Sequence, residues 1–131
     1  MNTDRLQGFI ALQAAIWTGE GRMLDGSNKY AWTWQIKEEC LEEYVAMHLA
    51  PWPEIMAEHS KAGIRNYSIF QQGNQFFYCF ECDDVAAAFA YIAKSEACQR
   101  WNAITSKMVK GSFDFNEAEP IKPMREVFYL K

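Results

Sequence analysis

Long hydrophobic runs are missing from this sequence. No apolar stretch approaches the ~20 residues that a membrane-spanning helix requires. Residues 6–17 are moderately apolar, but Gln7 and Gln13 interrupt them and no convincing signal-peptide cleavage site follows. We therefore expect a cytoplasmic protein that makes no contact with a membrane.

Excess positive charge is missing as well. The chain carries 13 Lys and Arg against 17 Asp and Glu, a formal net charge of -4, and its basic residues are scattered. Because phosphate binding requires a basic face, this composition predicts that neither nucleic acid nor an anionic membrane surface is a partner.

Several kinds of chemical motif are also absent. Four cysteines in an aromatic-rich chain of this size indicate reduced thiols rather than a disulfide framework. Cys79 and Cys82 have the C-x-x-C spacing, but a strand would direct their sulfur atoms to opposite faces. His48 and His59 lack a recognised metal-ligand spacing, and there is no phosphate loop, nucleophile elbow or dinucleotide fingerprint. We predict no metal site and no cofactor.

The sequence does contain enough apolar surface for one core, with 50% apolar and 15% aromatic residues. Residues 1–29 are predicted to be an N-terminal extension, with a short helix over 3–17 followed by a linker rich in turn residues. Residues 30–131 are predicted to form the main α+β domain.

Periodicity and turn residues predict the elements of that domain. In order, they are a strand over 30–37, a helix around His48, a helix from Pro53 to Gly63, strands over 64–70 and 75–82 that form a hairpin, a helix from Asp83 or Asp84 to Lys94, a helix from Ser95, a polar loop over 111–123 and a final strand over 126–130. The Phe-rich strand over 75–82 is expected to be covered on both faces.

This order is a βαββαβ unit, in which the helices cover one face of an antiparallel sheet. The other face of the sheet also needs a cover. Apart from its short N-terminal segment, the chain supplies no second layer, so a second copy of the sheet is the simplest cover. The sequence therefore predicts a homodimer.

The stretch around His48 is the candidate for chemistry. Tyr44 and His48 are one helical turn apart on the apolar face, and Pro51 and Pro53 are expected to break the helix just after them. A histidine on such a face is by default a core residue. Beside a phenol and a chain break, however, it can reach a cavity and exchange protons with a hydroxyl near neutral pH.

The large aromatic residues leave two interpretations open. Tyr44, Tyr67, Trp34 and Trp101 are either core fillers or the hydrogen-bonding and stacking surfaces of a sugar site. Alternation alone does not choose between these interpretations.

From Tyr30 to the C-terminus, the sequence resembles the L-rhamnose mutarotase family of small sugar 1-epimerases. The matching segments, in order, are Glu43-Tyr44 with His48 four residues on, Pro51-Trp52-Pro53-Glu54, Asn66-Tyr67, Cys98-Gln99-Arg100-Trp101 and Glu126-Val127-Phe128-Tyr129-Leu130. The first 29 residues have no counterpart in the family pattern.

The resemblance implies ferredoxin-like protomers that form a dimeric α+β barrel. It also implies an isomerase that interconverts the anomers of a 6-deoxy monosaccharide, with L-rhamnose as the first expected substrate. His48 would be the proton donor, while Tyr44, Tyr67 and Trp101 would bind the sugar, with no metal or redox cofactor.

Two further residues complete the expected binding set, and both bear on the alternatives. Trp34 is a possible stacking face for the sugar. Asn102 stands where the family typically carries a second tryptophan, which leaves L-fucose open as the substrate. A cofactor-independent monooxygenase and a non-catalytic binding module on the same scaffold are the alternatives from other classes.

Overall fold

The computed structural model describes residues 29–110 and 122–131. Its elements are β1 (Lys29–Gln35), the short 3₁₀ helix η1 (Glu38–Cys40), α2 (Leu41–Leu49), α3 (Pro53–Lys61), β2 (Arg65–Gln72), β3 (Gln75–Glu81), α4 (Val85–Lys94) and α5 (Glu96–Thr105). The helix and linker predicted before residue 29 lie outside the described residues, as does most of the predicted loop over 111–123.

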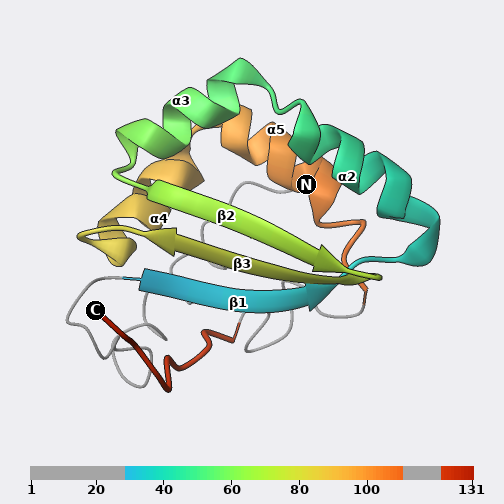
Figure 1. The fold of residues 1–131 in the computed structure, drawn as a ribbon. Helices are drawn as coiled ribbons and strands as arrows, with labels where there is room; N and C mark the ends of the chain where they lie inside the picture. Colours follow the sequence, from blue (N-terminus) through green and yellow to red (C-terminus); the bar gives the residue numbers. More distant parts are fainter. Residues whose placement is uncertain (1–28, 111–121) are drawn as a thin grey trace.

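The three strands form an antiparallel sheet in the order β1-β3-β2, with β3 in the centre. The predicted hairpin is confirmed, since β2 and β3 are joined by the two residues Gly73 and Asn74. Gly73 has a φ of +60°, a left-handed conformation that favours glycine. All four α-helices lie on one face of this sheet (Figure 1), as predicted for an α+β domain.

Capping residues explain where several helices begin and end. The Asp84 carboxylate accepts a hydrogen bond from the Ala87 amide at the start of α4, and the Ser95 hydroxyl accepts one from the Cys98 amide at the start of α5. Gly63, with a φ of +89°, follows α3 and turns the chain into β2. No helix in the described ranges is both long and apolar enough to cross a membrane.

The core lies between the sheet and the helices. Alternate residues of β1 and β3 point inward, and their rings stack in pairs: Trp32 on Tyr78 at 4.8 Å and Tyr30 on Phe80 at 5.4 Å between ring centroids. Within a single chain the expectation that β3 is covered on both faces is not met, because Phe77 on the opposite face is 37% exposed. Within the described residues, only the inner face of the sheet is packed against helices (Figure 1).

The predicted final strand over 126–130 is also wrong, because residues 122–131 contain no strand. The segment lies beside β1 (Figure 1), where the Met124 amide donates to the Ala31 carbonyl at 2.7 Å and Lys29 pairs with Glu126 at 3.2 Å. Strand propensity expresses fit to a neighbouring strand, and this segment meets β1 at too few backbone groups to form a ladder.

A bulge in β2 shapes the face that the helices cover. Arg65 pairs with Glu81 and Ser68 pairs with Cys79, so that Asn66 and Tyr67 together stand opposite the single residue Phe80. Asn66 has a φ of +51°, and its side chain donates to the Glu81 carboxylate at 3.0 Å. The bulge lets Tyr67 point toward the helices.

We expect Asn66→Ala to lower the free energy of unfolding by about 1 kcal/mol, because alanine disfavours the left-handed backbone that asparagine tolerates. Asn66→Gly, which accepts that backbone, should lose less. Urea unfolding of the two variants measures the difference, and an alanine variant at least as stable as the glycine variant would contradict this account.

Candidate functional site

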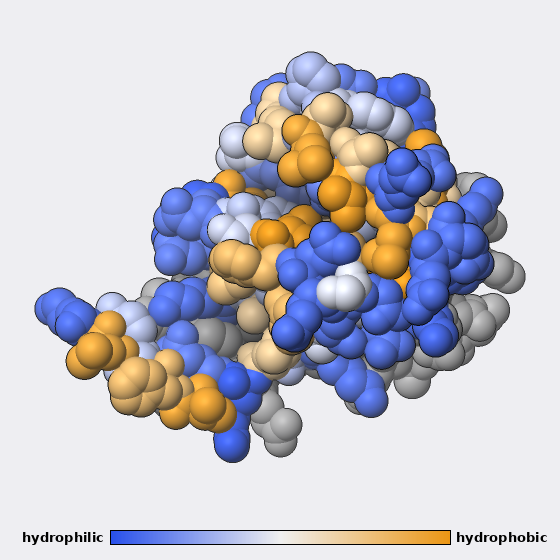
Figure 2. Space-filling model, turned by 45° about the vertical axis from the view of Figure 1, so that its right-hand side comes forward, coloured by the Kyte–Doolittle hydropathy of each residue, from blue (hydrophilic) through white to orange (hydrophobic). Residues whose placement is uncertain are grey.

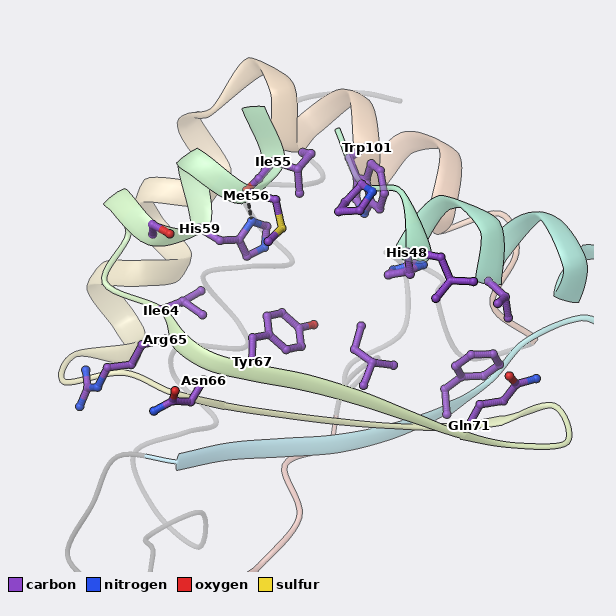
Figure 3. Close-up of a pocket in the computed structure, with 16 residues that line it drawn as sticks. His48, Ile55, Met56, His59, Ile64, Arg65, Asn66, Tyr67, Gln71 and Trp101 are labelled. Atoms are coloured by element: carbon purple, nitrogen blue, oxygen red, sulfur yellow. Dashed lines mark hydrogen bonds between the residues drawn. The ribbon is translucent and has the colours of Figure 1, made fainter. Parts of the chain in front are cut away.

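A cavity of about 570 Å³ opens between the α2–α3 pair and β2, within the usual size range of small-molecule sites. Sixteen residues line it, most of them apolar. The space-filling view shows the same region as a hollow bordered by apolar side chains (Figure 2). His48, His59 and Tyr67 bring ionisable groups to its wall (Figure 3).

The predicted helix break places His48 at this wall. The helix α2 ends at Leu49, Pro51 lies in the gap and Pro53 begins α3 with Trp52 as its N-cap residue. Because proline lacks a backbone donor and restricts the residue before it, α2 cannot continue through this segment. His48 therefore stands in the last turn of a helix, where the chain changes direction.

The ring of His48 is held in one orientation. Its Nδ1 lies 2.7 Å from the carbonyl oxygen of Tyr44, one turn earlier in α2. A carbonyl oxygen can only accept, so Nδ1 carries the proton and Nε2 of the neutral ring keeps a free lone pair. Burial lowers the pKa of His48 below its ordinary value of about 6.5, and the bond to Tyr44 opposes this shift in part.

Trp101 is brought beside His48 by two of the motifs noted in the sequence. Its ring meets the ring of Trp52 edge-on at 5.0 Å and that of His48 edge-on at 5.4 Å. The guanidinium of Arg100 lies over the ring of Trp52 at 5.8 Å and 3.9 Å from the carboxylate of Glu54. The two motifs thus form the contact between α3 and α5 that holds Trp101 at the cavity.

Tyr67 reaches the cavity from the bulge in β2. Its ring contacts those of Phe80 at 5.4 Å and His59 at 6.1 Å between centroids. Its side chain is 37% exposed, yet desolvation by surrounding protein atoms raises the pKa of its phenol above the ordinary value. Tyr67 is therefore a neutral hydrogen-bonding group at physiological pH.

Three residues predicted to bind substrate are absent from the cavity wall. Tyr44 is 2% exposed and its hydroxyl is hydrogen-bonded to that of Tyr78, while burial raises its pKa to about 12. Trp34 packs against Trp32 and Tyr78 on the inner face of the sheet. Asn102 lies in α5, next to Trp101, where its backbone carbonyl accepts from the Ser106 amide.

His59 is the residue that the sequence interpretation left out of the site. It lies on α3 four residues after the buried Ile55, and its Nδ1 is 2.8 Å from the carbonyl oxygen of Ile55. Burial lowers the pKa of His59 below its ordinary value. In the sequence, the sign that His59 faces inward is its position one helical turn after Ile55. That it lies opposite β2 is decided by the fold.

The C-x-x-C pair forms no joint site. Cys79 lies on the outer face of the sheet, whereas Cys82 is 1% exposed beside Gly63, so the two thiols face different ways as predicted. Burial raises the pKa of both thiols, which keeps them protonated at neutral pH.

These observations define a small α+β protein with a largely apolar cavity of the size of small-molecule sites and a histidine whose free ring nitrogen lies at its wall. Comparison with known proteins gives the family. The L-rhamnose mutarotase family model matches residues 29–130. The chain belongs to the L-rhamnose mutarotase family, a family of isomerases, which confirms the family and the enzyme class predicted from the sequence.

Individual relatives agree. The chain is 33% identical over 100 residues to the L-rhamnose mutarotase of Shouchella clausii, covering 73% of this chain and 91% of that protein. It is 35% identical over 99 residues to that of Bacillus subtilis, covering 72% and 90% respectively. The crystal structure of an L-rhamnose mutarotase from Formosa agariphila has a similar fold, with a TM-score of 0.61, 21% identity and coverage of 80% of this chain and all of that chain.

The lowered pKa values of His48 and His59 predict how stability depends on pH. Below about pH 6.5 the unfolded chain takes up protons that the folded chain resists, so stability falls as the pH drops; above it both states are neutral at these groups. Urea unfolding at pH 7.5, 6.5 and 5.5 measures the decline. The double variant His48→Gln/His59→Gln should decline less steeply, and an unchanged slope would exclude these histidines as the cause.

Proposed function

We propose that this protein is an L-rhamnose mutarotase in which His48 transfers the proton that opens and closes the sugar ring. The observation that carries the proposal is the hydrogen bond from His48 Nδ1 to the Tyr44 carbonyl, which leaves Nε2 free at a wall of the cavity. A neutral imidazole in this state first acts as a base. The proposal therefore gives His48 a role as a base in addition to the acid role expected from the sequence.

The proposed reaction needs one proton to move between two oxygens on the same carbon. Nε2 takes the proton of the anomeric hydroxyl, and the electrons left on that oxygen form the aldehyde C=O. The bond from the anomeric carbon to the ring oxygen breaks, its electron pair stays on the ring oxygen, and the imidazolium returns the proton there. Rotation of the aldehyde and the reverse steps give the other anomer.

Tyr67 and Trp101 are proposed as the substrate-binding residues. Both line the cavity, and the neutral phenol of Tyr67 can donate to a sugar oxygen. Trp101 offers an aromatic surface to an apolar face of the sugar, while its contact with Trp52 keeps it in place. Tyr44 supports the site indirectly, since its backbone carbonyl orients His48.

We expect His48→Gln to lower the anomer exchange rate of L-rhamnose by about 100-fold or more, because general acid-base catalysis contributes about 10²- to 10⁴-fold. Glutamine keeps a side chain of similar length but cannot exchange protons at neutral pH. Saturation-transfer NMR on the anomeric protons at equilibrium measures the rate, with L-fucose as the comparison sugar and His48→Ala as a second variant.

The same spectra separate the alternatives. Folded His48→Gln protein that exchanges the anomers as fast as wild type would refute the role of His48. Wild-type protein that binds L-rhamnose without accelerating exchange would be a binding module. Faster exchange of L-fucose than of L-rhamnose would change the assigned substrate, and oxygen consumption with an aromatic substrate would indicate a monooxygenase.

We further propose that the protein is a homodimer whose sheets face each other as a dimeric α+β barrel. The outer face of the sheet supports this, since Phe70 and Phe77 are paired across β2 and β3 and are 65% and 37% exposed. Val127, Phe128 and Leu130 are 73%, 75% and 80% exposed on the C-terminal segment, which projects from the molecule (Figure 2). Covering such residues is favourable at about 25 cal/mol per Å².

Sedimentation of the wild-type protein should give twice the 15.2 kDa of one chain. Phe70→Glu should shift it toward the monomer, because a carboxylate at this position would be desolvated between two sheets. Ile104→Glu is the matched control, since Ile104 is 39% exposed on α5, on the helical side. A wild-type protein that sediments as a monomer at micromolar concentration would refute the dimer.

A cytoplasmic location is proposed on the state of the cysteines. All four, Cys40, Cys79, Cys82 and Cys98, are free thiols. A reducing compartment maintains free thiols.

A further inference from the structure

We propose that His59 is a second substrate-binding residue, whose Nε2 accepts a hydrogen bond from a ring hydroxyl on the part of the sugar that lies away from His48. The inference rests on the proposed function and deepens it. Proton transfer by His48 does not distinguish one sugar from another, because every aldose has an anomeric hydroxyl. In this inference His59 distinguishes sugars by the positions of their other hydroxyl groups.

The geometry of His59 repeats that of His48. Each Nδ1 donates to the backbone carbonyl one turn earlier in its helix, at 2.8 Å for His59 and 2.7 Å for His48. Since those carbonyls only accept, each neutral ring keeps a bare Nε2 that can only accept. Figure 3 shows the two rings on different sides of the cavity, one from α3 and one from α2, with Tyr67 between them in this view.

Two other polar residues at this end of the cavity, Arg65 and Asn66, are engaged elsewhere. The guanidinium of Arg65 pairs with Asp83 at 2.9 Å, and the amide of Asn66 donates to Glu81 at 3.0 Å. Figure 3 shows the side chains of Arg65 and Asn66 directed away from the cavity. His59 therefore presents an acceptor here, beside the neutral phenol of Tyr67.

A hydroxyl group is the ligand chemistry that this pair fits. A sugar hydroxyl can donate to Nε2 of His59 and accept from the hydroxyl of Tyr67, whose ring lies 6.1 Å from that of His59. The wall around His59 includes the apolar side chains of Met56 and Ile64. In such surroundings an acceptor without a partner is costly, so a ligand that supplies the donor is favoured over one that does not.

The test compares His59→Leu with His59→Gln. Leucine fills similar space without an acceptor, whereas the amide oxygen of glutamine can accept and should restore part of the binding. We expect His59→Leu to raise the Kd for L-rhamnose by about 3- to 10-fold, the loss typical of one neutral hydrogen bond. Tryptophan fluorescence reports the Kd because Trp101 lines the cavity.

Substitutions of the two histidines should affect different steady-state constants, KM for His59 and kcat for His48. For His59→Leu, we expect KM to rise with Kd while kcat stays within about twofold of the wild type, because the bond to a remote hydroxyl is the same before and during ring opening. His48→Gln should lower kcat instead. Circular dichroism and urea unfolding check that each variant is folded.

Deoxy sugars identify the hydroxyl. The 2-, 3- and 4-deoxy derivatives of L-rhamnose each lack one candidate donor, and the penalty of His59→Leu should disappear for the one whose missing hydroxyl contacts His59. An unchanged Kd for L-rhamnose in folded His59→Leu, or an equal penalty with all three derivatives, would overturn the inference. So would a loss of kcat at unchanged Kd, which would assign His59 to proton transfer.

The outcomes also separate this inference from the proposed function. Wild-type protein that binds L-rhamnose but does not exchange its anomers refutes the mutarotase, while the Kd of His59→Leu still decides the role of His59. Wild-type protein that neither binds nor exchanges L-rhamnose overturns both.

Discussion

The break in the chain at Pro51 and Pro53 is the constraint on which the rest of this site depends. The two prolines remove backbone donors and restrict the residues before them, so one continuous helix cannot pass through this segment. Because the prolines interrupt that helix, α2 and α3 lie over the sheet as two separate pieces, and the cavity opens beneath them. The residue within the break, Trp52, packs against Trp101 and so draws α5 to the same cavity. One local backbone restriction thus gathers side chains from three helices.

Two hydrogen bonds from ring nitrogens to backbone carbonyls then decide what the histidines can do. Each bond removes the freedom of the ring to choose its tautomer, and each leaves Nε2 as the only group available to a ligand. Burial acts in the same direction by lowering the pKa of both rings, so the neutral form is the resting state near pH 7. The neighbouring phenols stay protonated because burial raises their pKa. The histidine rings therefore present acceptors, and the phenols present donors.

Large apolar side chains are exposed on the outer face of the sheet and on the C-terminal segment, and a few more, such as Leu49 and Met56, are exposed on the helices. Inside the described chain the sheet is covered by helices on one side only. The segment over 126–130 has the composition of a strand but lies beside β1 without a ladder, and its large side chains point into solvent. The second copy of the chain that we propose accounts for both features.

Local patterns in the sequence determined the three strands, the helices, the hairpin, the break after His48 and the pairing of Tyr44 with His48 one turn apart. These depend on residues close together in the chain, where proline, glycine and the period of apolar residues act directly. The sequence motifs also identified the family. Only the tertiary structure decided that Tyr44 is buried and does not line the cavity, that Trp34 packs against Trp32 and Tyr78, and that His59 lines the cavity. Those placements depend on how α3 lies over β2 and on the bulge at Asn66, and such packing joins residues whose separation in the chain gives no sign that they meet.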